Sequence, residues 1–249
     1  MSDSKKNLNL IDSQESSRIM RSLGRGMSRR EMLGVLVAGG MQLSLATGLV
    51  SVSGQALAQD TPPKRGGKIR VAGITASIND TMDPAKQSNQ SDYIRGNMFY
   101  NGLTVLDSRL APQPALAEEF STKDAKVWTF KLRKGVTFHD GKPLTPADVI
   151  FSIMRHKDPA TASKAKSLAD QIEEVKESGP NEVQVVLSVA NADLPVILGT
   201  FHFHIVKAGT TDFNKAIGTG PFKLKLFEPG VRSVGVRNEN YWKPGKPYC

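Results

Sequence analysis

Hydrophobic and polar positions alternate most regularly in the centre of the chain. Residues 127–133 place Trp128, Phe130 and Leu132 on one side and polar side chains on the other. A period of two residues is typical of a strand that buries one face. We therefore predict a half-buried strand here, as the best-defined element of the sequence.

A helix is predicted to follow this strand. Thr145 is placed to cap it, Pro146 fits the first helical position, and Asp148 completes a capping-box-like pair. The helix should end before Asp158, because that residue precedes a proline. Its buried face is predicted to consist of Val149, Ile150, Ile153 and Met154.

Weaker patterns predict the rest of the elements. They are a buried strand at 69–74, a short helix from Asp92 closed by a left-handed Gly102, turns at 134–135 and 140–141, a helix at 160–169, a turn at 179–181, and strands at 183–189, 222–226 and 231–236. Strands and helices are thus mixed, with several hairpins. This pattern favours an α/β to mixed α+β domain.

The first 58 residues have the pattern of an export signal. Ser28-Arg29-Arg30 precedes an apolar stretch at 32–52, which ends close to Ala56-Leu57-Ala58. The paired arginines Arg29 and Arg30 favour the twin-arginine route, and Ala56 and Ala58 predict cleavage near Ala58. A general secretory signal and an uncleaved anchor are the alternatives. We expect a periplasmic protein.

Composition excludes several classes of partner and site. Residues 59–249 carry 26 Lys+Arg against 20 Asp+Glu, a net charge of +6 without a basic cluster among aromatic residues. This mild surplus does not indicate a nucleic-acid partner. Cys249 is the one cysteine, which excludes an internal disulfide and any CxxC site.

The histidines are the first candidates for chemistry. His202 and His204 flank Phe203 at strand spacing, so both rings could share one face and a metal, but a third ligand is not evident nearby. A structural role for this pair is the preferred interpretation. His139-Asp140 lies before a turn glycine, where Asp bonds its own backbone. His156 is placed for the dipole at a helix end.

Signatures of nucleophilic or phosphate chemistry are missing from the sequence. It contains no G-x-S-x-G and no H-E-x-x-H, and Gly218-Thr219-Gly220-Pro221 does not continue into a phosphate-binding loop. We therefore expect a protein that is not an enzyme and needs no cofactor.

Several segments together resemble one family. The stretch 128–141, with Pro143-Leu144-Thr145-Pro146-Ala147-Asp148-Val149 after it, is similar to the hallmark segment of family 5 extracellular solute-binding proteins. These are the receptors of peptide, dipeptide and nickel ABC importers. Further matching segments are 66–70, Asp83-Pro84, 100–103, 116–118, 218–222 and 238–242.

The resemblance implies a two-lobed type II periplasmic-binding-protein fold that closes on a ligand between its lobes. Family members continue beyond the segment at 238–242, so we expect residues 59–249 to form only an incomplete first lobe. Some strand edges would then lack a neighbour, and the fragment is expected to be marginally stable. The ligand-binding residues implied by the resemblance are Gln87, Ser88, Asn89, Gln90, Ala165, Gly218, Thr219 and Gly220.

The function implied is capture of a peptide or similar small solute in the periplasm and its delivery to an ABC permease in the inner membrane. The twin-arginine translocase is the expected export partner. Nickel chelates, sugars and opines remain open as solutes. The alternatives are a chaperone-like or sensory relic of the same fold and, less favoured, an exported metal-binding enzyme.

Overall fold

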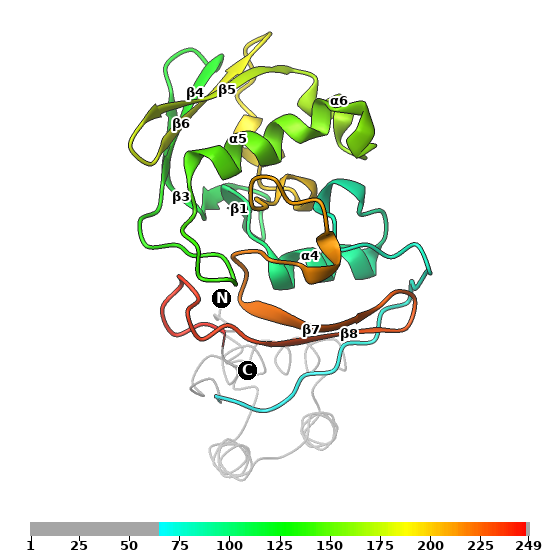
Figure 1. Cartoon of the computed structure of the whole chain (residues 1–249). Helices are drawn as coiled ribbons and strands as arrows, with labels where there is room; N and C mark the ends of the chain where they lie inside the picture. Colours follow the sequence, from blue (N-terminus) through cyan, green and yellow to red (C-terminus); the bar gives the residue numbers. More distant parts are fainter. Residues whose placement is uncertain (1–64, 248–249) are drawn as a thin grey trace, which may run out of the picture. The chain divides into compact units, whose positions relative to one another are not determined.

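The computed structural model describes residues 65–247 (Figure 1). Its strands are β1 (Thr104–Leu106), β2 (Pro112–Pro114), β3 (Ala117–Thr122), β4 (Val127–Leu132), β5 (Ile172–Gly179), β6 (Glu182–Leu187), β7 (Phe222–Glu228) and β8 (Arg232–Arg237). Its α-helices are α4 (Gln90–Phe99), α5 (Pro146–Met154), α6 (Lys166–Ala169) and α7 (Leu194–Ile197). Short 3-10 helices are η1 (Pro84–Lys86), η2 (Arg155–Lys157), η3 (Pro159–Thr161), η4 (Phe201–Phe203) and η5 (Phe213–Lys215). The mixed α/β prediction is confirmed.

The largest sheet is antiparallel, with the order β3-β4-β6-β5, and α5 packs against β5 and β6 (Figure 1). The predicted central strand is confirmed as β4, whose Trp128, Phe130 and Leu132 are buried while the residues between them are not. Trp128 pairs with Val185 of β6, and Phe130 with Val183. Alternation on both strands therefore directs one apolar face of the sheet toward α5.

The predicted start of α5 is also confirmed. The backbone N–H of Thr145 donates to the Asp148 carboxylate at 2.8 Å, and the Thr145 hydroxyl donates to the same oxygen at 2.7 Å. These bonds satisfy groups that a helix start leaves free. Val149 and Ile153 are fully buried, and Ile150 and Met154 pack against the same core.

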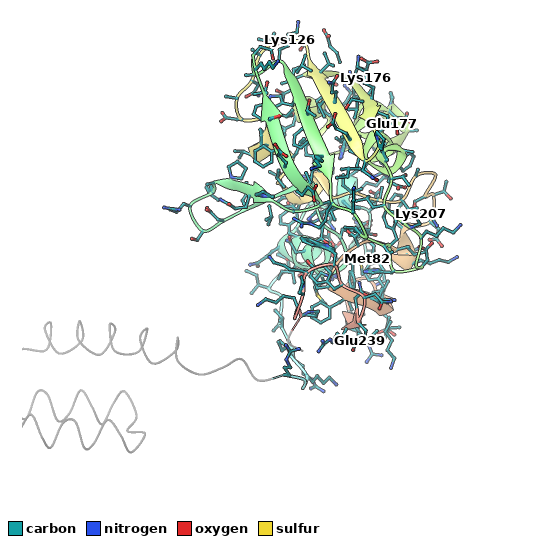
Figure 2. The ribbon with its side chains drawn as sticks, turned by 90° about the vertical axis from the view of Figure 1, so that its left-hand side faces the viewer. Met82, Lys126, Lys176, Glu177, Lys207 and Glu239 are labelled. Carbon is teal, nitrogen blue, oxygen red and sulfur yellow. The ribbon has the colours of Figure 1, made fainter. Side chains whose placement is uncertain are left out.

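A second part of the described chain consists of the β7–β8 hairpin and α4, which packs against β7 (Figure 1). Phe99 and Tyr100 at the end of α4 share a small buried core with Met82, and Phe222, Leu224 and Phe227 of β7 are packed against it. Figure 2 shows the four-stranded sheet, with Lys126 at its outer end, above the part that contains Met82. The hairpin turn at Glu228-Pro229-Gly230 is confirmed, with Gly230 at a φ of 74°.

Some local predictions are wrong. Residues 69–74 form no strand in the described structure, and the side chains of Ile69, Val71 and Ile74 are exposed. An apolar run specifies a buried strand only where a neighbouring strand is present to pair with it. Gly102 does not cap α4, because the helix ends at Phe99 and its C-cap residue, Tyr100, is extended.

The reason for a glycine at position 102 is close packing instead. A Cβ atom there would come within 2.8 Å of the Thr104 carbonyl oxygen and 3.0 Å of the Leu198 carbonyl oxygen. Only a residue without a side chain tolerates backbone at that distance. The glycine therefore lets β1 and the end of α7 approach each other.

The helix predicted at 160–169 is also wrong in its extent. The structure has the 3-10 turn η3 and the four-residue α6, separated by Ala162 in the left-handed conformation. Strand β5 was not predicted, because its burial pattern repeats every three residues rather than every two at Ile172 and Val175. A bulge between Ile172 and Glu174 accounts for this shift.

No helix among residues 65–247 is long and apolar enough to cross a membrane. The segment with the predicted signal, including Arg29, Arg30, Ala56 and Ala58, lies outside the described residues.

Candidate functional site

The loop 83–90 is built from local caps. Asp83 caps η1 by accepting from the Ala85 N–H at 3.0 Å, and Asn89 caps α4 by accepting from the Asp92 N–H at 3.1 Å. Asp and Asn are suited to these positions because their short side chains reach the free N–H groups of a first turn. The loop therefore has a defined path at both ends.

Contacts from segments that are distant in the sequence fix the position of the loop. The guanidinium of Arg155 donates to both oxygens of Asp83, at 2.7 and 2.8 Å. The N–H of Lys164 donates to the Ala85 carbonyl at 2.8 Å, and His202 Nε2 lies 3.0 Å from the Gln87 carbonyl oxygen. The structure thus brings together two of the three predicted ligand segments, 87–90 and the one around Ala165.

The side chains of these two segments differ in exposure. Ser88 and Gln90 are exposed, so their polar groups are available at the surface, whereas Asn89 is half-buried and its amide already bonds Asp80 and Asp92. Gln87 and Ala165 are buried, at 0% and 2% exposure. Additional chain can only increase burial, so Ser88 and Gln90 are the predicted ligand residues that this loop exposes, beside the exposed Lys86.

The third predicted segment, Gly218-Thr219-Gly220, lies elsewhere. The Gly220 N–H donates to the Phe99 carbonyl at 3.0 Å, which places the segment at the C-terminal end of α4, whereas the loop 83–90 lies at its N-terminal end. A ten-residue helix separates its ends by about 15 Å. All three residues are buried. The two glycines are required because a Cβ atom at either would come within 2.0–2.4 Å of Phe99 backbone atoms.

His139 holds the Gly218–Gly220 segment in place. Its Nε2 lies 3.0 Å from the Gly220 carbonyl oxygen, and the Gly218 N–H points to Nδ1 at 3.3 Å. The ring thus contacts both glycines of the segment, and Nδ1 also lies 3.2 Å from the Ala216 carbonyl oxygen. Burial lowers the pKa of His139, although the carbonyl oxygens of Gly220 and Ala216 oppose this effect. His139 therefore has a structural role.

The predicted common face for His202 and His204 is wrong. The segment forms the 3-10 turn η4 rather than a strand, so His202 reaches the Gln87 carbonyl while His204 is buried against Tyr100. Burial lowers the pKa of both rings, that of His204 to about 3. Within residues 65–247, no group of three or more His, Cys, Asp or Glu residues is arranged to hold a metal ion.

A ring cluster beside the loop was not predicted. Tyr93 of α4 stacks on Phe201 with 3.7 Å between ring centroids, and His202 lies 4.4 Å from Phe201. All three rings are half-buried. Phe201 and His202 come from η4, more than 100 residues from Tyr93, and sequence patterns carry no signal for such a distant pairing. The cluster joins η4 to α4 below the exposed loop residues.

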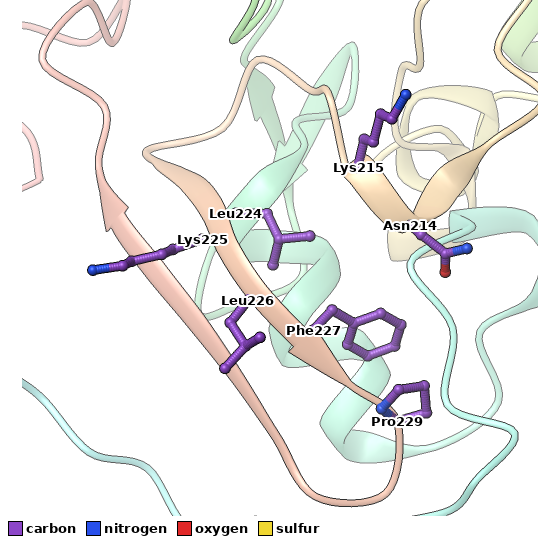
Figure 3. Close-up of a pocket in the computed structure, with 7 residues that line it drawn as sticks. All are labelled: Asn214, Lys215, Leu224, Lys225, Leu226, Phe227 and Pro229. Carbon is purple, nitrogen blue, oxygen red and sulfur yellow. The ribbon is translucent and has the colours of Figure 1, made fainter.

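A separate pocket of about 500 Å³ lies along β7. Figure 3 shows Phe227 and Pro229 facing the side of Asn214, with Lys225 on the opposite side of the strand. None of the predicted ligand residues lines it. This pocket is therefore distinct from the loop 83–90.

Comparison with known proteins identifies the family. The family described as "Bacterial extracellular solute-binding proteins, family 5 Middle" matches residues 111–249. The chain belongs to this family, and its mixed α/β architecture is part of a type II periplasmic-binding-protein fold.

Individual relatives agree with this assignment. The chain is 32% identical to the uncharacterized protein YhjP of Bacillus subtilis, over 84% of this chain and 34% of the relative. It is 29% identical to the oligopeptide-binding protein AppA of Bacillus subtilis, over 89% of this chain and 44% of the relative. The structure of AppA in complex with a nonapeptide superimposes with a TM-score of 0.66 at 26% identity, covering 72% of this chain and 38% of that one. The chain thus spans less than half the length of these relatives.

Proposed function

We propose that this chain is the N-terminal part of lobe one of an exported substrate-binding subunit of an ABC importer. In this proposal, residues 1–58 are a twin-arginine signal and residues 59–249 carry part of the cleft. The solute is a peptide or a similar small molecule, and the closed receptor delivers it to a permease in the inner membrane. The subunit performs no chemical step.

The family membership carries the proposal. The oligopeptide-binding name of AppA and the nonapeptide in its structure favour a peptide among the possible solutes. The geometry of the loop supports the same function, because Arg155 holds the Asp83 carboxylate and Lys164 and His202 hold loop carbonyls, while Ser88 and Gln90 remain exposed. A rigid support with a few accessible polar groups is typical of a ligand site.

Peptide binding tests this function. We would titrate the purified chain, and a version continued through the second lobe of AppA, with peptides of three to nine residues by calorimetry. The continued version is expected to bind peptide and the chain alone to bind it weakly, since half of the cleft is supplied by the second lobe. Failure of the continued version, with a cooperative melt showing that it folds, contradicts the proposal.

Variants locate the ligand contacts. In the continued version, Ser88→Ala and Gln90→Ala should each weaken peptide binding about 2- to 12-fold, which corresponds to one hydrogen bond of roughly 0.5–1.5 kcal/mol. Ser108→Ala is a matched control, because Ser108 is also exposed, in the turn between β1 and β2. Equal affinities for all three variants would remove the loop from the site. A stoichiometric metal in the purified protein would favour the metal-binding alternative.

Export is tested separately. The chain should be recovered from the periplasm of a host with an active twin-arginine translocase and be retained when Arg29 and Arg30 are both replaced by lysine. N-terminal sequencing of the exported form should begin at Gln59. Export of the lysine variant at the unaltered rate would indicate the general secretory route.

A further inference from the structure

Two polar groups beneath the loop 83–90 lack hydrogen-bond partners. The side-chain amide of Gln87 has neither its nitrogen nor its oxygen bonded, and Nδ1 of His204 is also unbonded, among all atoms of residues 65–247. Gln87 is 0% exposed and His204 is 6% exposed. Buried polar groups are rarely left in this state, since they lose their hydration without replacement.

The three atoms lie around one place in the structure. A Cβ atom on Gly96 of α4 would be 2.8 Å from Gln87 Oε1, 3.1 Å from Gln87 Nε2 and 3.3 Å from His204 Nδ1. All three atoms therefore lie within 3.3 Å of one point beside the Gly96 backbone, and a side chain at position 96 would collide with the Gln87 amide. A small molecule that forms hydrogen bonds of about 3 Å could span the three atoms.

The chemistry of these three atoms defines which hydrogen bonds the bound molecule has to donate and accept. The Gln87 amide presents one acceptor and one donor. His204 is neutral at physiological pH, because burial, assisted by the charge of His202, lowers its pKa to about 3. A neutral ring with its proton on Nε2 offers Nδ1 as an acceptor. The occupant therefore has to donate two hydrogen bonds and accept one.

We propose that Gln87, His204 and Gly96 form a binding site for one buried water molecule. The water donates to Gln87 Oε1 and to His204 Nδ1 and accepts from Gln87 Nε2. Three bonds are the typical number for a buried water. The site lies inside the domain, so additional chain that covers the surface leaves it unchanged.

The site has a consequence for the loop above it. The Gln87 carbonyl is already bonded to His202 Nε2, and the water fixes the side chain of the same residue. Gln87 is then held at both its backbone and its amide, directly before the exposed Ser88. We therefore assign it to positioning the loop and not to ligand contact.

Crystallography of the full chain is the direct test. A density peak within hydrogen-bonding distance of all three atoms supports the site. A structure in which the Gln87 amide bonds directly to Nδ1, with no peak, overturns it.

The melting temperature of a variant gives an independent test, because a bound water and a dry site predict changes in opposite directions. Met has nearly the shape of Gln without its hydrogen bonds, so Gln87→Met should lower the melting temperature by roughly 2–4 °C if the water is present. A dry site predicts the reverse, because an unsatisfied amide would be replaced by an apolar group. A higher melting temperature for this variant therefore overturns the proposal.

A double-mutant cycle with His204→Phe completes the test. Because both residues bond the same water, the combined loss should be smaller than the sum of the two single losses. Additive losses would indicate that the residues share no ligand. The exposed Gln113→Met serves as the control and should not shift the melting temperature.

Discussion

The four-stranded sheet with α5 (the sheet region) and the β7–β8 hairpin with α4 (the hairpin region) are built in different ways. In the sheet region, β4 and β6 each bury every second residue, and α5 covers the apolar face. In the hairpin region, no residue of β7 or β8 is fully buried. Both have alternating sequences, so alternation alone does not determine whether a strand becomes part of a closed core.

Besides its small apolar core, the hairpin region depends on polar contacts. Arg95 of α4 bonds Asp80 and Asp92 at 2.7 Å each and reaches Ser233 of β8 at 2.8 Å. Burial raises the pKa of Asp92. Burial also acts to raise that of Asp80, but Arg95 and Asn89 outweigh it and the pKa of Asp80 is lowered. A two-stranded hairpin has little stability of its own, and here a buried ionic cluster joins it to the helix.

The largest expected difference is in the cores. Phe130→Ala removes a fully buried ring from the sheet region and should lower the free energy of unfolding by about 3–5 kcal/mol. Val234→Ala, on the partly exposed strand β8, should change it by less than about 0.5 kcal/mol. Urea denaturation of both variants checks the contrast. Similar losses would show that the hairpin is packed as tightly as the sheet.

The second prediction concerns the ionic cluster. Arg95→Met leaves two buried carboxylates without their cation and should destabilise the protein by about 3 kcal/mol. The loss is near the lower end for such pairs because Asp92, whose pKa is already raised, can take up a proton. Arg232→Met is the control, since Arg232 pairs with Glu228 at the exposed hairpin tip. Equal stability of the two variants in urea denaturation would contradict the role of the cluster.

Local sequence patterns predicted parts of both regions, including the strands of the hairpin, but not strand β5 of the sheet region. Strand β4, the Thr145 cap and the turn glycines Gly135 and Gly141 follow from local rules, because period, capping and turn chemistry involve residues close in sequence. The prediction of a strand at 69–74 was wrong because the burial of such a segment depends on a neighbouring strand. Of the site, the sequence indicated the loop 83–90. It gave no signal for Arg155 or His202, whose contacts span 72 and 115 residues.

A third prediction tests close packing at the start of the hairpin. A Cβ atom at Gly220 would lie 2.4 Å from the Phe99 carbonyl carbon, so Gly220→Ala should cost roughly 1–3 kcal/mol. Gly179→Ala, at the end of β5, meets nothing closer than 3.8 Å and should be neutral or stabilising by up to about 1 kcal/mol. Opposite signs in thermal unfolding are expected. Loss of stability only at Gly179 would contradict the close approach.

Acid should weaken both regions together. Burial lowers the pKa of His156, next to α5, to about 4, and that of His204, beside Tyr100, to about 3. In the unfolded chain both histidines bind a proton near pH 6.5. Their contribution to the stability of the folded protein is therefore complete above that pH and is lost as the pH falls toward 4. Each histidine should contribute a loss of about 1 kcal/mol between pH 6.5 and 5.5. Calorimetry at both pH values should give a single transition that moves to lower temperature. Two separate transitions would show that the regions unfold independently.

The smallest effect on stability is expected at the hairpin edge. Val236 is 44% exposed on β8, which pairs only with β7 among the described strands, and Val231 and Val234 are exposed nearby. Such an edge can pair with another chain, and a charged side chain discourages this. Val236→Lys should therefore leave the melting temperature almost unchanged but reduce self-association in light scattering. Lys176 lies on β5, an edge of the sheet region that already carries charged residues, so Lys176→Gln is the control and should not alter association. If Val236→Lys destabilised the protein strongly, the edge would be part of a core, and the difference between the two regions would disappear.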